Sequence, residues 1–170
     1  MLSDRMRRII TPLLLASLLL VASCRAQDTS TYSKVQKEST QRNAPAAVAK
    51  KAEKGGSFNK FFPKSGDGYQ VVPSQEKKGF AEYKLNKGGK NVAMLSINDT
   101  ISNPSAAKKY DQSTEKIGGY PAAESPGKGT GILVNNRYQV KVQSRDDSFT
   151  KSDRVAWLQK FNLNGLSRLK

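Results

Sequence analysis

The stretch that decides the fold reads Arg-Tyr-Gln-Val-Lys-Val-Gln-Ser-Arg, at residues 137–145. Apolar and polar side chains alternate along it: Tyr138, Val140 and Val142 fall on one side, and Gln139, Lys141 and Gln143 fall on the other. An alternation with a period of two is typical of an antiparallel strand that is buried on one face and solvated on the other. The stretch therefore predicts an antiparallel sheet with one wet face.

Five segments upstream also have the composition of strands. The first group covers residues 69–75, 80–85 and 91–98, and the second covers 120–124 and 130–134, just before the 137–145 strand. Gly88-Gly89 predicts a hairpin turn in the first group, because glycine accepts the positive φ that a tight turn requires. Asn135-Asn136 predicts a tight turn in the second group.

Each group of three strands is followed by a predicted helix. Asn103-Pro104 has the sequence of a helix start, and this helix would run to about Lys116 and end at Gly118-Gly119. The spacing of Thr150 and Asp153 fits a capping box at the start of the final helix. The apolar stripe of that helix consists of Val155, Leu158 and Phe161 with Trp157, and we expect Leu163 and Leu166 to continue the contact.

The segment before the first strand is rich in phenylalanine. Ser57 predicts the start of a single helical turn that carries Phe58, Phe61 and Phe62 and ends at Pro63. We expect these rings to cover the core. Together the elements predict a single α+β domain over residues 57–170, with an antiparallel sheet of about six strands in the order βββα-βββα, packed by helices.

The N-terminus has the layout of an export signal. A basic cluster comes first, formed by Arg5, Arg7 and Arg8. The apolar run that follows, residues 13–21, is too short to span a bilayer permanently. It ends in Val21-Ala22-Ser23-Cys24, which resembles the lipobox of bacterial lipoproteins. The resemblance implies that residues 1–23 are a signal peptide and that Cys24 is acylated, which fastens the chain to a membrane because each buried methylene contributes about 0.8 kcal/mol.

Three other interpretations of this region stay open. It could be an ordinary signal peptide with an incidental cysteine, an uncleaved anchor, or a twin-arginine signal at Arg7-Arg8. Met6 is a second candidate for the start of the chain. Arg25 follows the cysteine, where lipoproteins retained in the inner membrane of some bacteria carry an aspartate. The resemblance therefore implies an exported chain, lipid-anchored to the outer membrane and facing the periplasm.

Residues 25–56 predict a tether. Tyr32, Val35 and Val48 are the only bulky apolar side chains in this segment, so it cannot bury enough surface to offset the entropy of ordering. We therefore expect residues 24–56 to form the acylated cysteine and a flexible basic linker. A small lipoprotein with the predicted sheet is similar, in architecture alone, to the PsbP-type lumenal lipoproteins of photosynthetic bacteria.

The chain is strongly basic, with 29 Lys and Arg against 14 Asp and Glu and a net charge of +15. Residues 57–170 contain nineteen of the basic and ten of the acidic groups, so the predicted domain is itself basic. An excess of positive charge attracts anionic surfaces. The candidate contacts with an anionic lipid or polymer are Lys84, Lys141 and Arg145, on predicted outward strand faces. A soluble basic protein without such a ligand is the alternative.

The composition excludes most familiar catalytic designs. The chain has no histidine, and its one cysteine is the lipidation candidate, so His-based triads, thiolate nucleophiles and Cys/His metal sites are excluded. The spacing Ser-x-x-Lys, which some serine–lysine enzymes use, occurs several times, as expected in a chain rich in serine and lysine, so it does not indicate a catalytic site. The glycine-rich stretch at residues 127–131 lacks the residues of a phosphate-binding loop. Carboxylate pairs stay open, because only their separation in space defines them. We expect no enzyme, no cofactor and no metal site.

Two functions follow from these patterns. The first is a membrane-anchored, non-catalytic envelope lipoprotein that acts as a binding or accessory module for a partner protein or complex. The second is a binder of anionic envelope ligands, such as lipid headgroups, cell-wall polymer or lipopolysaccharide. Nucleic-acid binding would use the same charge, but the chain has no aromatic-basic motif for it and the expected compartment is the wrong one.

Overall fold

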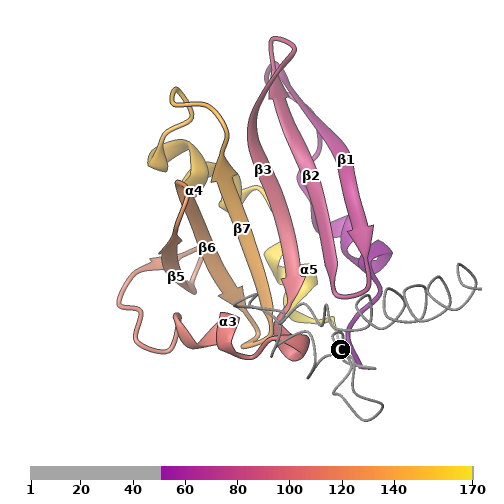
Figure 1. Cartoon of the computed structure of the whole chain (residues 1–170), viewed down its shortest axis with the longest axis vertical. Helices are drawn as coiled ribbons and strands as arrows, with labels where there is room; N and C mark the ends of the chain where they lie inside the picture. Colours follow the sequence, from indigo (N-terminus) through magenta and orange to yellow (C-terminus); the bar gives the residue numbers. More distant parts are fainter. Residues whose placement is uncertain (1–50, 170) are drawn as a thin grey trace, which may run out of the picture. The chain divides into compact units, whose positions relative to one another are not determined.

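The 137–145 stretch forms the central strand of a seven-stranded sheet, in a computed structural model that describes residues 51–169 (Figure 1). The strand order is β1-β2-β3-β7-β6-β5-β4, and every neighbouring pair is antiparallel. The strands are β1 (Tyr69–Lys77), β2 (Phe80–Lys87), β3 (Lys90–Asp99), β4 (Lys116–Ile117), β5 (Tyr120–Ser125), β6 (Gly129–Val134) and β7 (Tyr138–Ser144). The α+β class and the antiparallel sheet are confirmed, with seven strands where about six were predicted.

Both predicted tight turns are confirmed by their backbone angles. Gly88 and Gly89 have φ values of 56° and 79°, and Asn135 and Asn136 have values of 52° and 50°. Two consecutive positive φ values twist the chain in the sense that joins neighbouring antiparallel strands directly. The second turn delivers the chain from β6 into β7, which then pairs with β3 along Ala93–Asp99.

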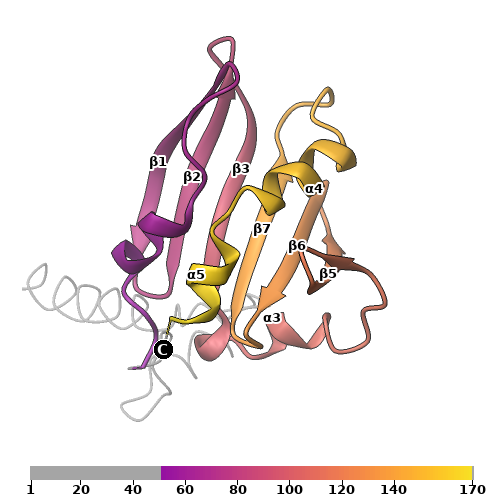
Figure 2. The ribbon, with the colours of Figure 1, turned by 180° about the vertical axis from the view of Figure 1, so that it is seen from behind.

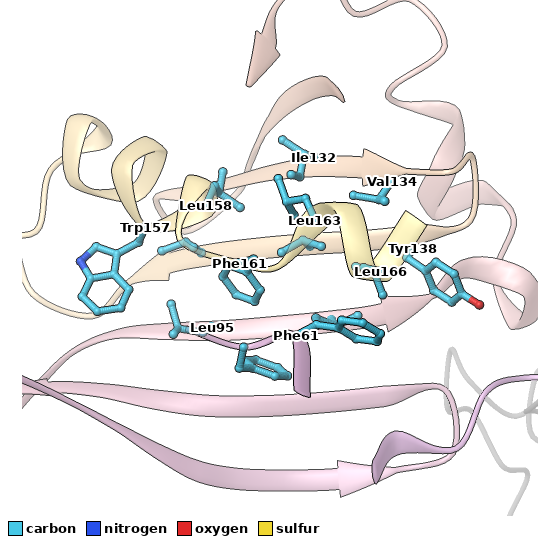
Figure 3. Close-up of a cluster of buried hydrophobic side chains, with 14 of the residues drawn as sticks. Phe61, Leu95, Ile132, Val134, Tyr138, Trp157, Leu158, Phe161, Leu163 and Leu166 are labelled. Atoms are coloured by element: carbon cyan, nitrogen blue, oxygen red, sulfur yellow. The ribbon is translucent and has the colours of Figure 1, made fainter. Parts of the chain in front are cut away.

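Helical segments pack on one face of the sheet, which we call the covered face (Figure 2). They are η2 (Gly55–Phe61), α4 (Lys151–Gln159) and α5 (Leu163–Ser167). The predicted inward side chains of β7 point to this face, and Tyr138, Val140 and Val142 are all fully buried. Phe61, Phe161 and Leu166 lie between the helical layer and the sheet (Figure 3). The three phenylalanines of the η2 region are buried in this core, as predicted.

The start of α4 has the predicted capping box. The Thr150 side chain accepts a hydrogen bond from the Asp153 backbone N–H, and the Thr150 backbone N–H donates to the Asp153 carboxylate over 2.7 Å. These bonds satisfy donors that the first helical turn leaves unpaired. The helix they start directs Trp157 and Leu158 into the core.

The predicted helix over residues 104–116 is wrong. α3 covers only Ser105–Lys108, and turns follow. The reason is tertiary: the Ser113 hydroxyl donates to the Ala122 carbonyl, and the Ala122 N–H donates to the Glu115 carbonyl over 2.9 Å. These contacts hold the segment against β5 and lead it into β4, which supplies the seventh strand.

Residues 51–56, which the sequence assigns to the tether, pack against the domain. The Glu53 N–H donates to Asp99 over 2.9 Å, and Ala52 is buried beside the β1–β2 turn. η2 begins at Gly55, two residues before the predicted start, where a Cβ would lie 2.5 Å from the Lys77 carbonyl oxygen. The predicted signal peptide (residues 1–23), Cys24 and the predicted tether residues 25–50 lie outside the described residues.

Candidate functional site

The face opposite η2, α4 and α5 is the open face of the sheet (Figure 1). It carries two of the three predicted anion contacts, Lys84 and Lys141. In the strand register Lys84 lies opposite Met94, and Ser96 lies opposite Lys141. Met94 and Ser96 are two residues apart on β3, so their side chains point to the same side. Lys84 and Lys141 therefore share the open face, on either side of β3.

Long polar side chains take the place of a helical layer at the centre of this face. Met94 and Ser96 are only 8% and 5% exposed, although η2, α4 and α5 lie on the other side. Lys84 and Gln143 flank Met94 in the register, and Glu82 and Lys141 flank Ser96. Lysine and glutamine stems can cover apolar surface while their polar ends stay in water. The open face therefore presents charged and amide groups to solvent, while Met94 and Ser96 at its centre are buried beneath the stems of these side chains.

Arg145 lies at the end of β7. Its backbone N–H donates to the Val92 carbonyl over 2.8 Å, and its side chain is exposed. It is therefore accessible, but it belongs to the sheet's end and not to the middle of the open face. Nearby, Lys90 and Lys128 form ion pairs with Asp146 and Asp147.

A third cation of this face, Lys109, was not predicted from the sequence. Lys109 lies in the turns after α3, and its ammonium group donates to the Ser125 hydroxyl over 2.7 Å. Next to it, Tyr110 is buried against the open face, where its hydroxyl accepts from the Gln139 amide over 3.0 Å. A Cβ at position 131 would lie 2.5 Å from the Tyr110 oxygen, so Gly131 leaves the space that this ring occupies. Burial raises the pKa of Tyr110 to about 12.

None of the ion pairs within residues 51–169 includes Lys84, Lys109, Lys141 or Arg145. Partial burial of its ammonium group, and then the positive charge of Lys141, hold the pKa of Lys109 below its ordinary value. A like charge close to an amine acts in this direction because it disfavours the protonated form. The open face thus has cations that form no ion pair with a carboxylate of residues 51–169.

The charged cluster on the covered side is different, because it is internally paired. Arg154 is 6% exposed and donates to Thr130, Ser144 and Glu124 over 2.8, 3.0 and 3.1 Å. Burial alone would raise the pKa of Glu124, but the hydrogen bond from Thr130 and the charges of Lys151 and Arg154 bring it below its ordinary value. A satisfied network of this kind supports the fold.

One surface hollow, of about 240 Å³, is lined mainly by amides and apolar side chains, and Tyr120 is its one ionisable residue. A second hollow, of about 230 Å³, has Lys77, Lys78 and Asp99 in its lining, and the Asp99 carboxylate accepts hydrogen bonds from Arg137. In the described part of the chain, no group of three Cys, Asp or Glu residues is placed to hold a metal ion. No helix between residues 51 and 169 is long and apolar enough to cross a membrane.

No protein-family model, curated protein or solved structure matches this chain.

Proposed function

We propose that this chain is an exported lipoprotein, anchored through Cys24 to the outer membrane and facing the periplasm, with a domain that serves as a non-catalytic binding or accessory module for a partner protein. The observation that carries the proposal is the Val21-Ala22-Ser23-Cys24 motif at the end of a short apolar run behind a basic segment. The proposed binding role is supported by the domain, because within residues 51–169 the helical segments η2, α4 and α5 all pack on one face of its sheet and leave Lys84 and Lys141 on the other.

Site-specific photocrosslinking in intact cells tests this role. A photoreactive amino acid replaces Lys84 on the open face or, as the matched control, the exposed Ser152 on α4. We expect one envelope protein to be captured from position 84 and not from position 152. The adduct should disappear with Cys24→Ala, because the chain then leaves the membrane. Identical adducts from both positions, or an adduct that Cys24→Ala leaves unchanged, would contradict the proposal.

A second function is favoured by the unpaired cations: binding of an anionic envelope ligand. Lys84, Lys141 and Arg145 stand outside every ion pair of residues 51–169. The test is cosedimentation of the Cys24→Ser chain with phosphatidylglycerol vesicles at rising salt, since screening weakens such contacts. Glutamine at these three positions should weaken binding more than glutamine at the exposed Lys54, Lys64 and Lys116. Equal loss in both triple variants would mean that only net charge matters.

A further inference from the structure

Two lysines converge on the turn between β5 and β6. The Lys109 ammonium group donates to the Ser125 hydroxyl over 2.7 Å and lies 5.0 Å from the centre of the Tyr110 ring. Lys141 approaches from β7, which pairs with β6. Its Cδ would lie 3.7 Å from a Cβ built on Gly129, and Ser125 Cβ would lie 3.2 Å from the same point. The two side chains thus flank Ser125 and the glycine opposite it.

The positions of both lysines are fixed by the fold. Lys141 lies on the central strand, with its stem passing over a residue that has no side chain. The backbone at Lys109 is anchored by its neighbour Tyr110, which is 2% exposed and hydrogen-bonded to Gln139, and the exposed Lys109 side chain reaches Ser125. Two cations that the fold holds near each other repel, and this repulsion opposes folding. A site whose groups repel in the free protein is stabilised when an anion binds between them.

Two acidic residues of the neighbouring strands, Glu124 and Glu82, lie away from the site. Glu124 lies opposite Thr130 on the covered side and accepts from Thr130 and Arg154. Glu82 is on the open face, but Ser96 separates it from Lys141 in the register. Neither carboxylate forms an ion pair with Lys109 or Lys141 in the described part of the chain.

We propose that a phosphate group carrying two negative charges, either free or as a phosphomonoester, binds between Lys109 and Lys141 beside Ser125. This inference rests on the second proposed function and names its site and ligand chemistry. Two ammonium groups match the charge of a phosphate dianion, whereas a carboxylate carries one charge. The Ser125 hydroxyl accepts from Lys109, so its own proton is available to a third phosphate oxygen.

The test is a phosphate titration of the ¹⁵N-labelled Cys24→Ser chain, followed by NMR at constant ionic strength with chloride as the balancing anion. We expect saturable shifts of the Ser125, Gly129 and Lys141 amides. Lys109→Gln and Lys141→Gln should each raise the dissociation constant by about tenfold, as expected for loss of one charge-assisted hydrogen bond. Lys141→Arg should keep most of the affinity. Lys54→Gln and Lys64→Gln, at exposed positions outside the site, are the charge-matched controls.

A parallel titration with lipid vesicles identifies whether the bound phosphate belongs to a lipid headgroup or to a soluble molecule. Phosphatidic acid vesicles carry a phosphomonoester headgroup and phosphatidylglycerol vesicles a phosphodiester. Line broadening of the same amides by phosphatidic acid supports a lipid source, and a response to inorganic phosphate alone supports a soluble one. Amide shifts that rise linearly with phosphate and do not saturate would overturn the proposal of this site. Phosphate binding by the Lys109→Gln/Lys141→Gln chain that equals binding by the chain with both lysines would overturn it as well. If that chain still cosediments with anionic vesicles, the second function survives without this site.

Discussion

The two faces of the sheet are formed by the same strands, but they differ in burial and in composition. On β3, Leu95 points to the covered face and is fully buried under the helical layer, whereas the next residue, Ser96, points to the open face between Glu82 and Lys141. One face supplies the apolar burial that stabilises the fold. The other is left to polar and cationic groups. The difference teaches that paired charges such as Arg154 lie within the packed side of this domain, whereas cations outside any described ion pair, such as Lys84 and Lys141, lie on the open face.

The largest expected effect separates the two faces on one strand. Leu95→Ala should destabilise the domain by about 3 kcal/mol, because it removes buried methyl groups and leaves a cavity. Ser96→Ala, one residue away, should change the free energy of unfolding by less than about 0.5 kcal/mol. Urea unfolding followed by Trp157 fluorescence measures both. Similar losses from the two variants would mean that the open face also carries the fold.

The next effect compares a paired with an unpaired arginine. Arg154→Met should cost about 2 kcal/mol, because Thr130, Ser144 and Glu124 lose a charged hydrogen-bond donor. We place the cost at the low end because the Glu124 side chain is 44% exposed and water can solvate it. Arg145→Met should leave unfolding unchanged. The comparison fails if Arg145→Met is the more destabilising of the two.

A smaller effect concerns acid stability at the end of the domain where residues 51–54 pack. Burial alone would raise the pKa of Asp99, but hydrogen bonds from Arg137 and from the Glu53 and Ile101 backbones bring it below its ordinary value of 3.8. The ionised form is therefore favoured by folding. Its stabilising contribution is complete above that value and is lost as pH falls through the lower, folded pKa.

Unfolding measured between about pH 5 and pH 2 checks this contribution. The unmodified chain should lose stability steadily toward acid. Asp99→Asn should be less stable at pH 7 and should show a shallower dependence on pH. A variant with the same slope as the unmodified chain would show that other carboxylates account for the acid sensitivity.

The smallest effect is a change in the reactivity of one amine on the open face. Burial and the charge of Lys141 hold the pKa of Lys109 below its ordinary value, which increases the neutral, reactive fraction at pH 8. Lys141→Gln should therefore slow acetylation of Lys109 by an activated ester. Peptide mass spectrometry gives the rate. An unchanged rate would mean that the two ammonium groups do not interact.

Local patterns were sufficient for most of the fold. The alternation at residues 137–145, the two turns with positive φ and the Thr150–Asp153 capping box depend on neighbours along the chain, and all three are confirmed. The placement of Lys84 and Lys141 on an outward strand face was predictable for the same reason, because side chains alternate between the two faces of a strand.

Lys109 was not predictable, because its position depends on contacts remote in sequence. Tyr110 packs in the space above Gly131 and accepts a hydrogen bond from the amide of Gln139. The sequence around Tyr110 does not predict contact with either residue. Helical propensity extended the 104–116 prediction through this segment, whereas tertiary contacts override such preferences. The short β4 strand was missed for the same reason, since it exists through pairing with β5.

Membrane anchoring is the claim on which the proposed function depends, and mass spectrometry of the intact chain extracted from cell membranes tests it most directly. The proposed anchor predicts a chain that begins at Cys24 and is heavier than its polypeptide by a diacylglyceryl group, with or without a further acyl chain on the amine. A chain with an unmodified Cys24 thiol, or with residues 1–23 still attached, would contradict it.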